Sequence, residues 1–341
     1  MGKSRQQRAN RGRLWATARG SSTGRSDARN SEGLPADDCG ICPGVALIEA
    51  VPNVSEGRRA PVIQALAAAV CGQPGVTLLD VSSDAAHNRT VFTLVGPPNE
   101  LHSALLSLYA VAIEAIDLRS HTGEHPRIGA VDVVPLVPLT VADMGVCVSA
   151  ATALAQAVAA RFDIPVYMYG RAARVPERER LELVRRGEFE GLASKMSEHS
   201  WCPDFGPHRP HPSAGASAIG ARKILIAFNV NLRTADLGIA RQIARLIRAS
   251  SGGLPAVKAI GVRTENREIV QVSINLVDHE TTALHTVFAA VEDEARRRGV
   301  VVEGSEIVGL APAVALLSTA AHCLGLRNVT MEQVLDCRLP R

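Results

Sequence analysis

The stretch GEHPRIGAVDVVP, residues 123–135, places a titratable side chain directly before an apolar run. Pro126 fixes its own φ and disfavours helical geometry at His125, so the backbone there is expected to be stiff and extended. The run from Ile128 to Val134 predicts a strand that enters a core. Histidine has an unperturbed pKa of ~6.5, which suits it to move a proton near neutral pH. A histidine that only hydrogen-bonds a turn is the alternative interpretation.

Composition limits the class of protein. The chain has 341 residues, which predicts about two packed units, and 46% of them are hydrophobic but only 3% aromatic. Residues 1–43 hold eight Lys or Arg against four acids, which leaves 37−8 = 29 basic and 34−4 = 30 acidic residues elsewhere. The remainder therefore has a net charge of −1. That balance argues against a nucleic-acid-binding protein.

The basic segment 1–43 lacks hydrophobic periodicity and predicts a disordered tail, with an organellar transit peptide as the less favoured alternative. No apolar run reaches the ~18 residues of a membrane span, so no membrane association is expected. The seven cysteines are scattered, and the CxxC pair Cys39 and Cys42 has no second pair nearby. We therefore expect no metal site and a reducing, cytoplasmic location.

Hydrophobic periodicity predicts a repeated order of elements. Strand, helix, strand, strand, helix and strand are expected in turn at residues 45–51, 58–71, 76–81, 87–96, 98–117 and 128–135. A helix at about 147–161, a strand at 166–169 and a charged helix near 177–187 extend this unit. Residues 189–221 are predicted to be irregular and, for that reason, functional or disordered.

The same order is then expected a second time, at residues 223–231, 234–249, 256–263, 269–276, 283–298 and 300–308. Two such units predict an α+β fold of two ferredoxin-like (duplicated β-α-β-β-α-β) subdomains, side by side with a groove between them. The boundaries expected are 44–221, with the connector loop, and 222–341.

Polar residues cluster where several of these strands end, the usual place for a site in open α/β sheets. Asn53 and Ser55 follow the first strand, although either could simply cap the next helix. Arg89 opens the third strand, whereas a hairpin turn suffices to explain His87 and Asn88. No P-loop, GxGxxG after a strand, catalytic triad or HExxH motif is present.

Together these segments closely resemble the formiminotransferase domain of the folate-dependent formimidoyltransferase family. The matching stretches include residues 51–57, 88–91, 123–132, 169–174, 203–207, 220–223, 227–232 and 284–287. They occur in the expected order between about residues 45 and 310. The animal enzymes of this family carry an added cyclodeaminase domain, for which this chain is too short.

The resemblance implies transfer of a formimino group from N-formimino-L-glutamate to tetrahydrofolate, which serves as co-substrate, and no metal. It also implies a homodimer. The family's catalytic histidine corresponds to His125, and its folate-binding loop to Gly206, Pro207, His208, Arg209, Pro210, His211, Pro212, Ser213, Ala214 and Gly215. The centre of that loop is more polar here than is usual in the family. Further candidates for substrate or folate contacts are Asn53, Ser55, Glu56, Arg89, Glu124, Arg127, Asp132, Arg174, Asn229 and Asn231.

The chemistry follows as a hypothesis. His125 would take the proton from the pteridine nitrogen as that nitrogen attacks the formimino carbon, and could return it to the departing glutamate nitrogen. Arg89, Arg127 and Arg174 could grip substrate carboxylates in bidentate fashion. Two rivals remain open: a formyl donor used on the same fold, and a folate-binding protein without catalysis.

Overall fold

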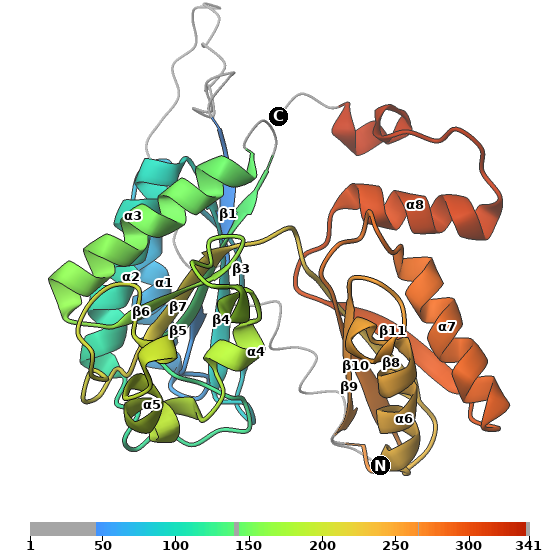
Figure 1. The fold of residues 1–341 in the computed structure, drawn as a ribbon. Coiled ribbons are helices and arrows are strands. Elements are labelled where there is room, and N and C mark those ends of the chain that lie inside the picture. Colours follow the sequence, from blue (N-terminus) through green and yellow to red (C-terminus); the bar gives the residue numbers. More distant parts are fainter. Residues whose placement is uncertain (1–45, 140–142, 265, 339–341) are drawn as a thin grey trace, which may run out of the picture. The chain divides into compact units, whose positions relative to one another are not determined.

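The computed structural model describes residues 46–139, 143–264 and 266–338 (Figure 1). The predictions for residues 1–43, including the pair Cys39 and Cys42, lie outside the described residues. The described chain is a mixed α+β structure with one sheet before residue 222 and another after residue 225, which confirms the predicted class.

The first sheet is built around a strand that proline interrupts. β1 (Ile48–Ala50) and β2 (Asn53–Val54) lie on either side of Val51 and Pro52, and both pair antiparallel with the same two neighbours. These neighbours are β4 (Arg89–Gly96) and β5 (Val131–Pro138). β3 (Thr77–Asp84) pairs with β4 on the outer side. The strand predicted for the EHPR motif is confirmed as β5, and all but the last of its residues are buried.

Three helices cover one face of this sheet: α1 (Ala60–Cys71), α2 (Pro98–Ala115) and α3 (Met144–Phe162). Their apolar faces form one core with the strands, in which Leu66, Leu105 and Leu154 are buried. By length and composition α3 could cross a membrane, but it packs on β5 and β7 as a core helix does. The helices predicted at 58–71, 98–117 and 147–161 are thus confirmed to within a few residues.

The segment predicted as irregular is ordered, which corrects the prediction for residues 189–221. It contains α5 (Glu188–Met196), a 3-10 turn (His199–Trp201) and strand β7 (Ser217–Ala221). β7 pairs in parallel with β5 and with β6 (Val166–Gly170) and is fully buried. The small residues of β7 do not predict a strand from sequence. A strand packed closely on both faces nevertheless requires small residues.

The charged helix predicted near 177–187 is a 3-10 turn (Pro176–Glu179) followed by the short α4 (Leu181–Val184). Val184 of α4 and Leu192 and Met196 of α5 pack on the opposite face of the sheet, against Tyr167 and Tyr169. The end of the sheet formed by β5, β7 and β6 is therefore covered on both faces.

The second sheet has the strand order β11-β8-β10-β9, antiparallel throughout. The strands are β8 (Ile226–Leu232), β9 (Val257–Arg263), β10 (Val270–Leu276) and β11 (Val302–Val308), as predicted. α6 (Leu237–Ile247) and α7 (Leu284–Arg297) pack on it through a separate core. α8 (Ala313–Leu324) was not predicted, and short 3-10 turns at Met331–Gln333 and Leu335–Cys337 follow it.

The crowding of β7 generates a stability prediction. A methyl group at Gly220 would lie 2.3 Å from the carbonyl oxygen of Tyr169 on β6. We expect Gly220→Ala to lower the free energy of unfolding by about 1–3 kcal/mol, the range typical of overpacking. Gly191→Ala, on α5 with nothing within 4 Å of the added methyl, is the matched control. Urea unfolding measures both, and equal stability of the two variants would contradict the assignment of β7 as a crowded inner strand.

Candidate active site

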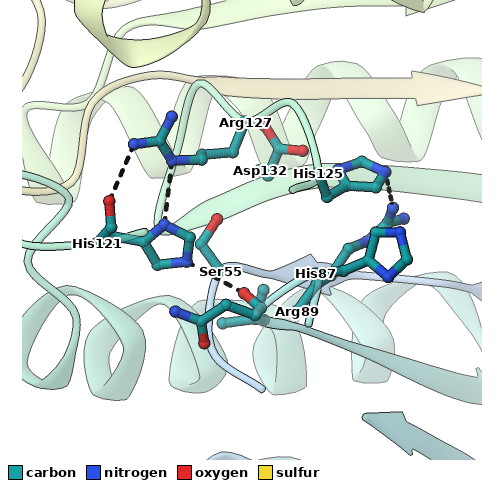
Figure 2. A pocket seen from close by; sticks show the side chains of 9 residues that line it. Ser55, His87, Arg89, His121, His125, Arg127 and Asp132 are labelled. Carbon is teal, nitrogen blue, oxygen red and sulfur yellow. Dashed lines mark hydrogen bonds between the residues drawn. The ribbon is translucent and has the colours of Figure 1, made fainter. Parts of the chain in front are cut away.

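One pocket gathers polar side chains from three parts of the first subdomain (Figure 2). The parts are the end of β2, the turn between β3 and β4, and the segment 121–132 that leads into β5. The lining residues are Val54, Ser55, His87, Asn88, Arg89, His121, His125, Arg127 and Asp132. Five of the predicted site residues, namely Ser55, Arg89, His125, Arg127 and Asp132, are therefore brought together.

Asn88 joins the three parts. Its φ of 49° lies in the left-handed region, which asparagine tolerates better than most residues. Its side-chain oxygen accepts from the N–H of Gly57 at 2.9 Å, and its side-chain amide donates to the carbonyl of Thr122 at 3.0 Å. The turn between β3 and β4 is thereby tied to both neighbouring segments of the pocket.

The ring of His125 has a defined tautomer. Nδ1 lies 2.8 Å from the carbonyl oxygen of Pro126, and because a carbonyl only accepts, Nδ1 carries the proton. The lone pair is then on Nε2, which accepts a hydrogen bond from Nη1 of Arg89 (Figure 2). The stiff backbone predicted at Pro126 thus supplies the carbonyl that orients the ring.

Positive charge surrounds this ring. Burial, and then the guanidinium groups of Arg89 and Arg185, lower the pKa of His125 to about 3. Burial and Arg185 likewise lower the pKa of Arg89 to about 10, which leaves Arg89 charged at neutral pH. Nε of Arg89 is buried without a hydrogen-bond partner among the described residues. The pocket therefore offers a neutral proton acceptor beside an incompletely paired cation.

Buried hydrogen bonds support the pocket from below. Asp132 accepts from the N–H of Ile128 at 2.8 Å and from Nη2 of Arg185 at 2.5 Å. Ser55 donates from its hydroxyl to the carbonyl of Gly129 at 2.7 Å. The bonds to Ile128 and Gly129 hold the backbone between His125 and β5, which indicates a positioning role for Asp132 and Ser55.

Arg127 was expected to bind a substrate carboxylate, but its guanidinium pairs with other side chains of the protein. It donates to Glu190 at 2.7 Å and to Glu188 at 3.0 Å, both on α5. It also donates from Nε to Nδ1 of His121 at 3.1 Å, and Nε2 of His121 donates to the carbonyl of Asn88 at 3.1 Å. Arg127 therefore links α5 to the wall of the pocket, a contact that sequence alone did not indicate.

Four other predicted residues do not line this pocket. Asn53 is buried and donates to the carbonyl of Val51 at 2.6 Å. Glu56 is buried and accepts from the N–H groups of Arg58 and Arg59, each at 2.8 Å, which makes it a cap for the turn before α1. Two more, Glu124 and Arg174, are exposed, and the guanidinium of Arg174 lies 4.2 Å from the centre of the Phe205 ring.

The predicted folate loop ends against the segment that carries His125. Gly215 has a φ of 69°, and a methyl group there would lie 2.1 Å from the carbonyl of Ile128. Ala130 donates its N–H to the carbonyl of Ala214 at 3.0 Å. His208 and Arg209 are exposed, and Nδ1 of His211 accepts from the N–H of Ala214 at 3.0 Å. None of residues 206–215 lines the pocket of His125, but their end is fixed beside it.

Asn229 and Asn231 lie on β8 of the second sheet. Asn231 accepts from Nε2 of Gln271 at 2.9 Å, and Asn229 donates to Glu306 at 3.3 Å. Both asparagines therefore have hydrogen-bond partners on the neighbouring strands β10 and β11.

His87, Asn88, His121 and Val54 line the pocket although sequence reasoning did not select them. The only available signal was their position beside Arg89 and His125, and a hairpin turn explained His87 and Asn88 equally well. A second pocket, of about 310 Å³, adjoins the first through Asn88 and His121 and is lined by Arg58, Arg59 and Asp117 among others. Within the described residues no cluster of three His, Cys, Asp or Glu is placed to hold a metal ion.

Comparison with known proteins shows the family. Residues 47–222 match the N-terminal subdomain of the formiminotransferase domain, and residues 227–334 match the formiminotransferase domain. The chain is 46% identical to a glutamate formimidoyltransferase of Streptococcus pyogenes serotype M1, over 86% of this chain and 98% of that protein. It is 40% identical to a glutamate formimidoyltransferase of Thermoplasma acidophilum, over 87% of this chain and 98% of that protein.

A formimidoyltransferase-cyclodeaminase of Rattus norvegicus is 44% identical over 86% of this chain, but only 55% of that protein is covered. The chain is therefore a transferase of the class that moves formimidoyl groups. It belongs to the formiminotransferase domain family.

The depressed pKa of His125 predicts a pH-dependent stability. Since the ring has a pKa of about 3 in the folded protein and ~6.5 when unfolded, the unfolded chain binds more protons between these values. Stability contributed by the neutral ring is thus present above pH 6.5 and is lost as pH falls toward 3. We expect His125→Gln to reduce this acid sensitivity, by at most about 1.4 kcal/mol per pH unit.

Urea unfolding at pH 7, 6, 5 and 4 measures the difference from the parent protein. His199→Gln, at an exposed histidine outside the pocket, is the control and should leave the slope unchanged. An unchanged slope in His125→Gln would contradict the neutral state of this half-buried ring.

Proposed function

We propose that the protein transfers the formimino group of N-formimino-L-glutamate to tetrahydrofolate, giving 5-formiminotetrahydrofolate and L-glutamate. The observation that carries this proposal is the lone pair of His125 Nε2, held in a pocket beside Arg89. Membership of the formiminotransferase family and the names of the two relatives that the chain covers almost completely support the choice of reaction.

His125 acts as the general base. N5 of tetrahydrofolate forms the new bond to the formimino carbon and passes its proton to Nε2 of His125. The hydrogen bond from Nδ1 to the Pro126 carbonyl keeps the ring in the tautomer that can accept it. One positioned base typically contributes ~10²–10⁴-fold to the rate, and joint orientation of two substrates contributes up to ~7–11 kcal/mol.

Arg89 receives a carboxylate of the glutamate moiety. Its guanidinium faces the pocket and its Nε has no hydrogen-bond partner in the part of the chain that the structure describes, so a carboxylate can form the bidentate pair that arginine favours. Such a pair removes the Arg89 donor from His125 Nε2 and offsets one of the two positive charges that depress the pKa of the ring. Substrate binding would then strengthen the base at the moment it is needed.

Tetrahydrofolate binds along residues 206–215. Support comes from the contacts that fix the end of this loop against residues 128–130, next to His125. The exposed His208 and Arg209 give the loop polar donors at its centre, where they could meet the glutamyl tail of folate. Asn53, Glu56, Glu124 and Arg174 are further proposed contacts, and Asn229 and Asn231 would act from the second subdomain.

We also infer that the two subdomains are a ferredoxin-like duplication. Within each sheet, the four strands of the β-α-β-β-α-β unit lie side by side in the order fourth, first, third, second. A cytoplasmic homodimer is proposed from the resemblance to the family, and light scattering tests its oligomeric state.

The assay mixes the protein with formiminoglutamate and tetrahydrofolate and follows 5-formiminotetrahydrofolate by absorbance. We expect turnover, and a fall in kcat of about 10²–10⁴-fold in His125→Ala. His199→Ala, outside the pocket, is the control that keeps full activity. Circular dichroism verifies that both variants fold.

Normal turnover by a folded His125→Ala variant would remove the base assignment. Turnover of formylglutamate but not of formiminoglutamate would favour the formyl donor. Binding of tetrahydrofolate without turnover of either donor would identify a folate-binding protein instead.

A further inference from the structure

A second histidine faces the same pocket and is not used by the mechanism above. His87 lies in the turn between β3 and β4, and the centre of its ring is 6.1 Å from the centre of the His125 ring, at an interplanar angle of 66°. In Figure 2 the two rings lie on either side of the Arg89 guanidinium. Both rings line the same pocket.

Asp84 holds this second ring in a defined orientation. One carboxylate oxygen accepts from the backbone N–H of His87 at 2.8 Å, and the other lies 2.8 Å from Nδ1 of the ring. Partial burial would raise the pKa of Asp84, but these hydrogen bonds from His87 lower it, so the carboxylate stays ionised. An ionised carboxylate only accepts, which makes Nδ1 the bound donor and leaves Nε2 as the nitrogen that can exchange protons.

The turn itself is fixed to the segment that carries His125. The bonds of Asn88 to Gly57 and Thr122 hold one end, and the N–H of Glu124 donates to the carbonyl of Ala86 at 3.3 Å. The distance between the two rings is therefore set by backbone contacts on both sides of the pocket. A loosely attached surface histidine would have none of these.

The reaction needs a proton at a second place. When the bond between the formimino carbon and the glutamate nitrogen breaks, that nitrogen must receive a proton to leave as a neutral amine. Because Nδ1 of His125 is bound to the Pro126 carbonyl, its Nε2 alone would have to take the proton from N5 and then deliver it to the glutamate nitrogen. His87 offers a second proton carrier in the same pocket, on a ring that a carboxylate holds in place.

We propose that His87 is a second catalytic residue, which donates the proton from its Nε2 to the departing glutamate nitrogen, and that Asp84 is its positioning residue. This rests on the proposed function. N5 loses its proton to His125 and gains the bond to carbon, while the carbon–nitrogen bond to glutamate breaks and its electron pair takes the proton of His87. The formamidinium group keeps its own charge, and return of the proton from His125 to His87 restores both rings.

The test compares steady-state kinetics of the wild type with those of His87→Ala, His87→Gln and Asp84→Asn, using formiminoglutamate and tetrahydrofolate. His87 and Asp84 have side chains about half exposed, so their substitution should leave the fold intact. We expect kcat of His87→Ala to fall by about 10²-fold with little change in KM, because the proton is needed only in the transition state. Added imidazole should restore part of that kcat.

The pH profile separates catalysis from a structural role. A general acid must be protonated, so kcat of the wild type should fall as pH rises, and His87→Gln should lack this alkaline limb. Asp84→Asn should keep the limb but lower kcat, because the ring loses the carboxylate that orients it. His199→Ala, at an exposed histidine outside the pocket, should match the wild type in kcat and profile.

Wild-type kcat and an unaltered alkaline limb in His87→Gln would overturn the inference and leave the proposed function standing. A fall in kcat that imidazole does not restore, together with an unaltered limb, would also overturn it. A wild type that does not turn over formiminoglutamate would overturn the proposed function, and this inference with it.

Discussion

The pocket depends on the orientation of one imidazole. The Pro126 carbonyl accepts a hydrogen bond from Nδ1 of His125, and Nε2 therefore presents its lone pair toward Arg89. The same proline keeps the backbone extended where it approaches β5. Ser55 and Asp132 hold the backbone that follows His125 in the chain. Neither side chain is proposed to contact a substrate.

Charge is arranged so that this ring stays neutral. Arg89 and Arg185 lie close enough to disfavour its protonation, while Asp132 pairs with Arg185. Arg89 lies beside His87 as well, but this ring also has the carboxylate of Asp84 as a direct partner. The two histidines thus differ in one charged neighbour, and such a difference separates a group that accepts a proton from one that donates it.

Much of the fold could be predicted from periodicity, because β5, α2 and the strands of the second sheet carry clear apolar patterns. β7 could not, because Ser217, Ala218 and Gly220 have small side chains that serve close packing and give no strand signal. α8 could not be predicted for a different reason. Of its residues only Ala315 is buried, so no apolar stripe distinguishes a core-facing side.

The candidate site was predictable only where residues differ from their surroundings in the sequence. Arg89 stands out because it opens an apolar strand, and His125 because it lies shortly before an apolar run. His121 and Arg185 do not stand out in this way. His121 lines the pocket and contacts Arg127, whereas Arg185 does not line it and pairs with Asp132, 53 residues away in the sequence. Likewise Arg127 was expected to face a substrate, whereas two glutamates of α5 occupy it.

The most direct test is nitrogen-15 NMR of the His125 ring in the folded protein, assigned by comparison with His125→Gln. We expect a neutral ring with its proton on Nδ1 from pH 7 down to pH 5. A ring that takes up a second proton near pH 6.5, or that carries its single proton on Nε2, would contradict it.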